Sequence, residues 1–231
     1  MSPTLQNLSL AACLLLCGYL SYRCFIPPTP PPSNPCAKDR LKRLQDMVNL
    51  SGIRKGNLFF MWTYHIVLIL LPLRRRSNIC VHPDLLNEDL FSWSRYSIIF
   101  ISVVLVAAPI RLLAYAQLGP NFTFGLTKPS RLMTTGIYRY VKHPSYTTFF
   151  LLNCACYFFF CRTDGVAACW LPLQVVKVKG LSVAVGTLLG GLTLFGLAIR
   201  VKDEEDMMRR EFGKEWEVYH NTTKRFLPGI I

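Results

Sequence analysis

Two short stretches of the sequence combine residue types that could bind and orient a small anionic molecule. In the first, Lys142–Tyr146 (KHPSY), basic and hydroxyl side chains precede an apolar run. Pro144 suits the first turn of a helix, because its missing N–H would have no partner there. The free N–H groups of that turn attract anions, and His143, Ser145 and Tyr146 would add donors around them. The alternative is an interfacial belt of aromatic and basic residues, which membrane helices commonly carry.

The second stretch begins at Arg200, where a long apolar segment ends, and has no Gly or Pro before Gly213. We therefore expect the apolar helix to continue and to stop near Gly213. Arg200 and Glu204 are four residues apart and would share one helix face. An arginine can grip a carboxylate through two parallel hydrogen bonds, and a glutamate accepts hydrogen bonds from ammonium or hydroxyl groups.

The same stretch is also typical of a solvated helix that is stabilised by ion pairs. Two pairs with a spacing of four residues are expected on its surface, Glu205–Arg209 and Asp206–Arg210. Such pairs need no function, but they do not explain Arg200. A charge at the boundary of a membrane segment is costly and usually functional.

The elements that must position these residues are strongly apolar. The 231-residue chain is 52% hydrophobic and carries a formal net charge of +13, a combination that is unusual for a soluble domain. Crossing a bilayer takes about 20 apolar residues. The segments Leu5–Tyr22, Tyr96–Leu118 and Leu181–Ile199 meet this length, and Leu58–Leu73 and Tyr146–Cys161 are marginal. We predict an all-α integral membrane protein with about five transmembrane helices and a cytosolic C-terminal helical extension.

The distribution of Lys and Arg predicts the orientation in the membrane. With the N-terminus outside and five crossings, 18 of the 26 Lys and Arg residues fall on the cytosolic side. The positive-inside rule favours this arrangement, although Arg74–Arg76 oppose it. Residues 119–144 and the tail after Arg200 would then be cytosolic, and residues 162–180 would be lumenal. Residues 1–7 contain no Lys or Arg, so the first segment is expected to be an anchor and not a signal peptide.

Proline and cysteine add to the expected organisation of the chain. Residues 1–57 comprise an anchor helix, a Pro-rich linker (27–35) and a basic connector, and residues 58–231 form the core with its catalytic half at about 115–231. The nine Cys form no Cys-x-x-Cys pair and no Cys/His cluster. We expect no metal site and no disulfide framework, and cysteines that act as small apolar side chains.

Several motifs in the C-terminal half occur in the order and spacing of one enzyme family. They are LGPNFTF (118–124), RLMTTGIYRYVKHPSY (131–146), RVKDEED (200–206), FGKEWEVY (212–219) and LPGI (227–230). With these motifs the chain resembles the isoprenylcysteine carboxyl methyltransferase family of integral membrane enzymes. The resemblance implies S-adenosyl-L-methionine as the cofactor, a prenylated protein or prenylcysteine as the substrate, and methyl transfer to the carboxylate of the C-terminal cysteine.

The resemblance also implies roles for individual residues and a location. Arg200 would be the catalytic residue that holds the substrate carboxylate. The expected cofactor-binding residues are Thr127, Ser130, Arg131, Leu132, Met133, Tyr138, His143, Pro144, Ser145, Tyr146 and Glu204. The protein would be a multi-pass protein of the endoplasmic reticulum membrane with its active site facing the cytosol, and neither a metal nor a nucleic acid is expected. Two residues depart from the family pattern, Lys142 in place of Arg and Thr148 in place of Gly.

The residue types fit this chemistry, but three alternatives stay open. A carboxylate is ionised at neutral pH, so its methylation needs orientation more than a strong base. A phospholipid N-methyltransferase must take a proton from an amine, which favours an acidic partner over Arg200. A sterol-reductase-like membrane oxidoreductase has a similar helical C-terminal region. A non-enzymatic membrane adaptor would leave the motifs unexplained, and the absence of a Gly-rich fingerprint makes a soluble Rossmann methyltransferase an unsuitable assignment.

Overall fold

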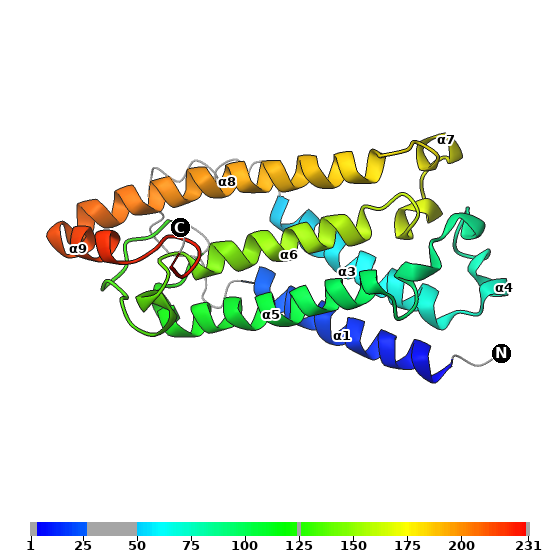
Figure 1. The fold of residues 1–231 in the computed structure, drawn as a ribbon, viewed down its shortest axis with the longest axis horizontal. Coiled ribbons are helices and arrows are strands. Elements are labelled where there is room, and N and C mark those ends of the chain that lie inside the picture. Colours follow the sequence, from blue (N-terminus) through cyan, green and yellow to red (C-terminus); the bar gives the residue numbers. More distant parts are fainter. Residues whose placement is uncertain (1–3, 27–49, 124–125, 230–231) are drawn as a thin grey trace.

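The computed structural model describes residues 4–26, 50–123 and 126–229, and the regular structure in this part of the chain is helical. Five long helices lie side by side, and the chain runs back and forth along them (Figure 1). They are α1 (Leu5–Phe25), α3 (Leu50–Leu70), α5 (Arg95–Leu118), α6 (Pro144–Phe160) and α8 (Leu181–Phe212). The predicted all-α fold is confirmed.

The helices form a bundle in which α8 is the least covered. Helix α5 packs against α6 and α1, α1 packs against α3, and α6 packs against α8. In the most apolar window of α8 only 11% of the residues are buried, against 39% in α1 and 44% in the segment that contains α5. The exposed side chains of α8 include Leu188, Leu192 and Phe195. This face is suited to contact with lipid tails.

Three described segments are long and apolar enough to span a membrane: α1, the segment Glu88–Asn121 that contains α5, and α8. These are the three long spans that the sequence predicts. In α3 the stretch Phe59–Leu70 is a shorter apolar helix, and α6 has 17 residues. That α3 and α6 also cross a membrane stays a prediction.

Two predicted helix boundaries are confirmed and place the residues of interest. Helix α6 begins at Pro144, with His143 in the position before its first residue. Helix α8 continues without a break beyond Arg200 to Phe212, and Gly213, with φ 49°, separates it from α9 (Lys214–Thr222). This φ lies in the left-handed region, which glycine adopts without strain.

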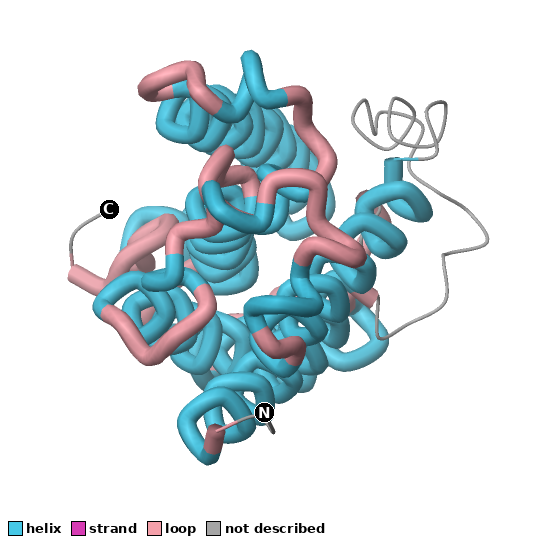
Figure 2. Tube along the Cα trace, turned by 90° about the vertical axis from the view of Figure 1, so that its right-hand side faces the viewer, coloured by secondary structure: helices cyan, strands magenta, loops and turns pink. Residues whose placement is uncertain are grey.

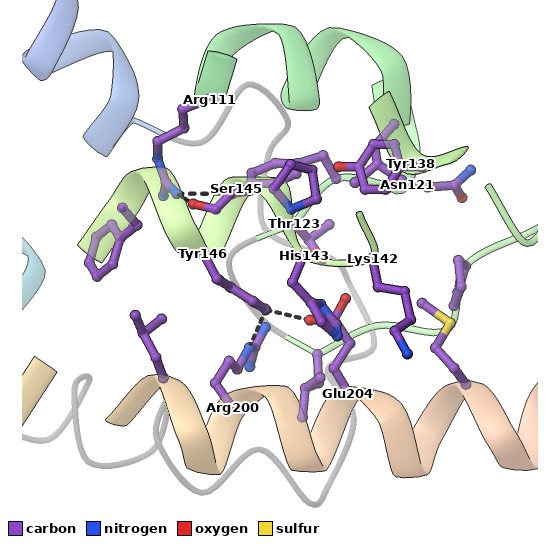
Figure 3. Close-up of a pocket in the computed structure, with 18 of the residues that line it drawn as sticks. Arg111, Asn121, Thr123, Tyr138, Lys142, His143, Ser145, Tyr146, Arg200 and Glu204 are labelled. Carbon is purple, nitrogen blue, oxygen red and sulfur yellow. Dashed lines mark hydrogen bonds between the residues drawn. The ribbon is translucent and has the colours of Figure 1, made fainter. Parts of the chain in front are cut away.

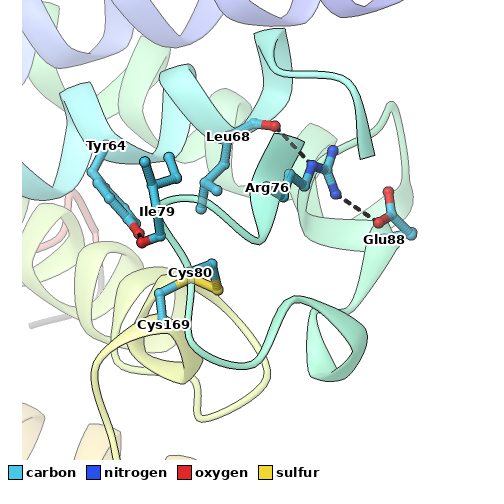
Figure 4. Close-up of a disulfide and its surroundings, with 7 residues drawn as sticks. All are labelled: Tyr64, Leu68, Arg76, Ile79, Cys80, Glu88 and Cys169. Atoms are coloured by element: carbon cyan, nitrogen blue, oxygen red, sulfur yellow. Dashed lines mark hydrogen bonds and ion pairs between the residues drawn. A yellow bond between two sulfur atoms is a disulfide. The ribbon is translucent and has the colours of Figure 1, made fainter. Parts of the chain in front are cut away.

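The end of the bundle that carries the N-terminus, α4 (Leu73–Arg76) and α7 (Leu173–Val176) is closed by a disulfide between Cys80 and Cys169 (Figure 4). We call it the disulfide end; Figure 2 views the bundle from this side, with the connecting loops in front. The expectation of no disulfide is wrong. The two cysteines are 89 residues apart, and only the return of the chain after α6 brings them together.

The opposite end carries α9, the loops that precede α6 and the C-terminal residues (Figure 1). We call it the cavity end. Helix α1 contributes Leu10, Leu14 and Cys17 to the same hydrophobic core as α3, α5 and α6. The expected division into residues 1–57 and 58–231 stays a prediction, because most of the connector lies outside the described residues.

Candidate active site

A cavity of about 590 Å³ opens at the cavity end, between α5, α6, α8, α9 and the loop that joins α5 to α6. All but one of the site residues expected from the sequence line it, and Ser130 is the exception. The lining members are Thr127, Arg131, Leu132, Met133, Tyr138, His143, Pro144, Ser145, Tyr146, Arg200 and Glu204. The structure therefore brings together residues that lie more than 70 positions apart in the sequence.

Tyr146 links the two charged residues of α8 that face the cavity (Figure 3). Its hydroxyl donates a hydrogen bond to the Glu204 carboxylate. Arg200 Nε donates to the same hydroxyl oxygen over 3.3 Å. Arg200 and Glu204 thus share one helix face, as their spacing predicts, and face the first turn of α6. The arrangement places a cation and a carboxylate side by side at the wall of one cavity.

His143 is held by a residue for which the sequence predicted a different role. Its Nε2 lies 3.1 Å from Glu205 Oε1, and Arg225 donates to both oxygens of that carboxylate over 3.0 and 2.7 Å. The predicted surface pair Glu205–Arg209 is wrong, because Glu205 is buried and faces the start of α6. The other predicted surface pair, Asp206–Arg210, stays a prediction.

Arg111 lines the cavity although it lies within the apolar segment Tyr96–Leu118, and no role was predicted for it. It is 5% exposed. One of its terminal nitrogens donates to the carbonyl and, over 2.9 Å, to the hydroxyl of Ser145. Its Nε donates to the Cys24 carbonyl over 3.2 Å. Arg111 therefore joins α1, α5 and the first turn of α6. A charge inside a membrane segment is the signal that could have identified it.

The loop that carries Arg131–Met133 is fixed at both of its ends. Asn121 Oδ1 accepts hydrogen bonds from the backbone N–H and the hydroxyl of Ser130, both over 3.0 Å, so Ser130 shapes this loop from outside the cavity. Gly136 has φ 63°, and a Cβ there would lie 2.4 Å from Gln117 Oε1. That oxygen accepts the N–H of Ile137 over 2.9 Å, which fastens the loop to α5.

Helix α9 borders the part of the cavity that is lined by His143, Ser145, Tyr146, Arg200 and Glu204, which we call the polar part. Trp216 and Tyr219 line it, and the Tyr219 hydroxyl donates to the Tyr138 carbonyl over 2.6 Å. Lys142 Nζ lies 3.1 Å from His220 Nδ1 and donates to the His220 carbonyl over 3.0 Å. Burial and the neighbouring Lys142 lower the pKa of His220. A neutral imidazole can then accept the hydrogen bond from Lys142.

The cavity continues from its polar part into an apolar part between α6 and α8. Leu189, Leu192 and Leu197 line this part from α8, and Phe149 lines it from α6. Gly196 also lines it, and a Cβ at that position would have no heavy atom within 4 Å. The wall is not wholly apolar, since the hydroxyls of Tyr157 and Thr193 lie 3.3 Å apart there.

Thr148, the second departure from the family pattern, has a local role in the structure. Its hydroxyl donates to the carbonyls of Pro144 and Ser145 over 3.0 and 3.1 Å. The side chain is buried. Its polar group is therefore satisfied within the first turn of α6, and the helix begins at Pro144 in spite of the branched residue.

Comparison with known proteins supports the resemblance seen in the motifs. Residues 98–185 match the family model of the isoprenylcysteine carboxyl methyltransferase (ICMT) family. Over 125 residues the chain is 27% identical to the protein-S-isoprenylcysteine O-methyltransferase of Dictyostelium discoideum, which is 52% of this chain and 44% of that protein. The chain thus aligns with less than half the length of this relative.

The matched region covers most of α5, the loop beside the cavity and α6, and it ends before Arg200 and Glu204. The region supplies the loop and the helix start on one side of the cavity, whereas α8 and α9 supply the other side. Over residues 98–185, this chain is similar to the isoprenylcysteine carboxyl methyltransferase family.

Proposed function

We propose that this methyltransferase transfers the methyl group of S-adenosylmethionine to the carboxylate of a C-terminal prenylated cysteine. The observation that carries the proposal is the position of Arg200 between the two parts of the cavity. Arg200 and Glu204 lie on one face of α8, and both contact the Tyr146 hydroxyl. Leu197 and Gly196 precede Arg200 on the same cavity wall. A lipid-linked carboxylate is the substrate that needs a cation next to an apolar channel.

The residues of the polar part fit S-adenosylmethionine, which supplies an electrophilic methyl group on a sulfonium. The cavity volume of about 590 Å³ lies within the usual range for small-molecule sites, about 300–1,000 Å³. Glu204 can accept hydrogen bonds from an ammonium or from ribose hydroxyls. The positive end of the α6 dipole, with the His143 imidazole beside it, suits a carboxylate. Trp216 and Met133 add apolar surface for a base.

Arg200 would orient the nucleophile in this reaction. A guanidinium can hold a carboxylate through two parallel hydrogen bonds and leave an oxygen lone pair directed at the methyl group. The carboxylate is already ionised, so no group of the protein has to remove a proton. Exclusion of water from the cavity and correct alignment of the two reactants supply the rate enhancement. Such alignment can raise the reaction rate by several orders of magnitude.

The disulfide supports the orientation that the basic residues favour. Disulfides persist in oxidising compartments such as the lumen of the endoplasmic reticulum and are rare in the cytosol. With Cys80 and Cys169 on the lumenal side, the cavity at the other end of the bundle faces the cytosol. Cytosolic proteins with a prenylated C-terminus would reach the cavity from this side, with the prenyl chain in the lipid beside α8.

Methyl transfer from radiolabelled S-adenosylmethionine tests the proposal. Detergent-purified protein should esterify a farnesylcysteine analogue, and base treatment should release the label as methanol. Phosphatidylethanolamine, offered in parallel, should accept no label. Label on the phospholipid amine and none on the thioether acid would instead support the phospholipid N-methyltransferase.

A labelling experiment tests the orientation separately. Single cysteines are introduced as Asn221→Cys and Lys179→Cys, both at exposed positions, in a variant from which the unpaired cysteines have been removed. In sealed microsomes an impermeant thiol reagent should label position 221 and spare position 179. The reverse pattern would place the cavity in the lumen.

A further inference from the structure

The last described residues of the chain lie against the start of α6. The N–H of Lys142 donates to the Lys224 carbonyl over 2.8 Å, and the N–H of His143 donates to the Arg225 carbonyl over 2.9 Å. The hydroxyl of Thr147 donates to the carbonyl of the next residue in the tail over 3.0 Å. These bonds involve residues that precede and follow His143 in the sequence. We call residues 223–227 the C-terminal strap.

Side chains also connect the C-terminal strap to the start of α6. The Arg225 guanidinium donates to both carboxylate oxygens of Glu205. One of these oxygens, Oε1, lies 3.1 Å from His143 Nε2. The side chains of His143 and Glu205 are 4% and 10% exposed, whereas Arg225 is 48% exposed. A chain of charged hydrogen bonds thus leads from the surface of the strap to a buried imidazole.

The direction of these hydrogen bonds determines which nitrogen of His143 carries a hydrogen. A carboxylate that is gripped by a guanidinium is ionised and can only accept hydrogen bonds. His143 Nε2 must therefore be the donor to Glu205. The hydrogen bond at one ring nitrogen fixes both the orientation of the ring and the chemical state of the other nitrogen. His143 lines the cavity, so its presentation there depends on Glu205.

We propose that Glu205 and Arg225 are positioning residues of the cofactor site and that the C-terminal strap completes this site. Glu205 holds the His143 ring in one orientation with the hydrogen on Nε2, and Arg225 holds Glu205. This inference rests on the proposed function for the identity of the ligand, S-adenosylmethionine. It predicts that two side chains that do not line the cavity control the affinity for the cofactor.

A double-mutant cycle separates positioning from a general effect on folding. The ligand is S-adenosylhomocysteine, and calorimetry on the full-length detergent-purified protein gives its affinity. Glu205→Gln keeps the shape and an acceptor oxygen but removes the charge, and it should weaken binding about tenfold, the loss typical of one charge-assisted hydrogen bond. In a His143→Ala background the same substitution should change the affinity less than twofold. An equal loss in both backgrounds would show that Glu205 does not act through His143.

Arg225 should have a smaller effect, because it acts one hydrogen bond further away and is half exposed. Arg225→Gln should weaken binding about threefold, and Arg225→Lys should recover part of that loss. The matched control is Glu211→Gln on the same helix, where the carboxylate is paired with Lys128 over 2.6 Å and does not line the cavity. It should leave both the affinity and the KM for the farnesylcysteine analogue unchanged.

A measurement on the ligand-free protein tests the positioning of His143 independently of which cofactor the protein binds. The chain has four His, so the nitrogen signals of His143 can be assigned in labelled protein by comparison with His143→Gln. The wild type should show a hydrogen fixed on Nε2, and Glu205→Gln should show exchange between the two nitrogens. A wild type without a hydrogen on Nε2 overturns the positioning role. Failure to bind S-adenosylhomocysteine, with the hydrogen in place, overturns the proposed function alone.

Discussion

The two ends of the bundle use their polar residues in opposite ways. At the disulfide end the polar groups bond to one another across short loops: Arg76 donates to the Leu68 carbonyl and to Glu88 over 2.9 and 2.7 Å, and Arg162 grips Asp164. At the cavity end they surround a space of about 590 Å³. Polar residues at the cavity end also bond to one another, as Tyr146 does with Arg200 and Glu204, but they line a space that a ligand can enter.

The ends are also fastened by different means. A covalent bond and a core of stacked aromatic rings, including the Phe100–Phe159 pair, hold the disulfide end. The cavity end is held by hydrogen bonds from α9 and the C-terminal strap to the loop before α6. The disulfide and the proposed site of chemistry therefore lie at opposite ends of the bundle. Substitutions at the two ends should therefore have different consequences.

The largest effect is expected at the polar part of the cavity. Glu204→Ala and His143→Ala should each reduce methyl transfer by more than about a hundredfold, because each removes a charged or polar side chain that we propose binds the cofactor. Calorimetry should show a parallel loss of affinity for S-adenosylhomocysteine. Wild-type affinity in both variants would show that the cofactor binds elsewhere in the molecule.

The apolar part of the cavity should respond to a bulky side chain at Gly196. Gly196→Phe can enter open space, since no heavy atom lies within 4 Å of its Cβ position. It should raise the KM for the farnesylcysteine analogue about tenfold and leave cofactor affinity unchanged. Gly191→Phe is the matched control, because Gly191 is equally unobstructed on the same helix and does not line the cavity. Equal effects of the two variants would refute the assignment of this channel.

The disulfide end should affect stability more than activity. Replacement of both Cys80 and Cys169 by Ser releases a loop with a sequence separation of 89 residues, which typically costs about 2–4 kcal/mol of unfolding free energy. The unfolding midpoint should fall, while methyl transfer well below that midpoint should stay within about twofold. A loss of activity in the fully folded variant would contradict the separation of the two ends.

The smallest effect concerns pH at the contact between Lys142 and His220. The pKa of His220 is lowered in the folded protein, so the unfolded chain takes up this proton at a higher pH than the folded protein does. The contribution of the contact to stability is present above pH 6.5 and is lost as the pH falls through the lowered pKa. His220→Asn should flatten the acid side of the profile of unfolding midpoint against pH. An unaltered profile would exclude His220 as its source.

The features that were predicted from the sequence are local. The start of α6 at Pro144 and the end of α8 at Gly213 follow from the geometry of single residues. The clustering of His143 with Glu204 was expected only through the order of family motifs. Periodicity alone placed both residues on helices without bringing those helices together.

The features that were missed depend on pairing between distant segments. Cys80 and Cys169 are 89 residues apart, and Glu205 meets Arg225 only because α9 turns the chain back toward α6. On a helix diagram Glu205 is indistinguishable from a surface residue, because its spacing from Arg209 fits an ordinary ion pair. Among these residues, Arg111 alone could have been identified from the sequence, because a charge within an apolar membrane segment usually indicates a functional residue.

The central claim is that Arg200 holds the carboxylate of the substrate at the cavity end. Steady-state methyl transfer to the farnesylcysteine analogue, with S-adenosylhomocysteine affinity measured on the same preparations, tests it in Arg200→Lys and Arg200→Ala. Lys keeps the charge but loses the planar fork, so the rate should fall about ten- to a hundredfold, and further in Ala. Cofactor affinity should stay near wild type in both. If Arg200→Ala abolishes cofactor binding, or leaves methylation intact, the account is contradicted.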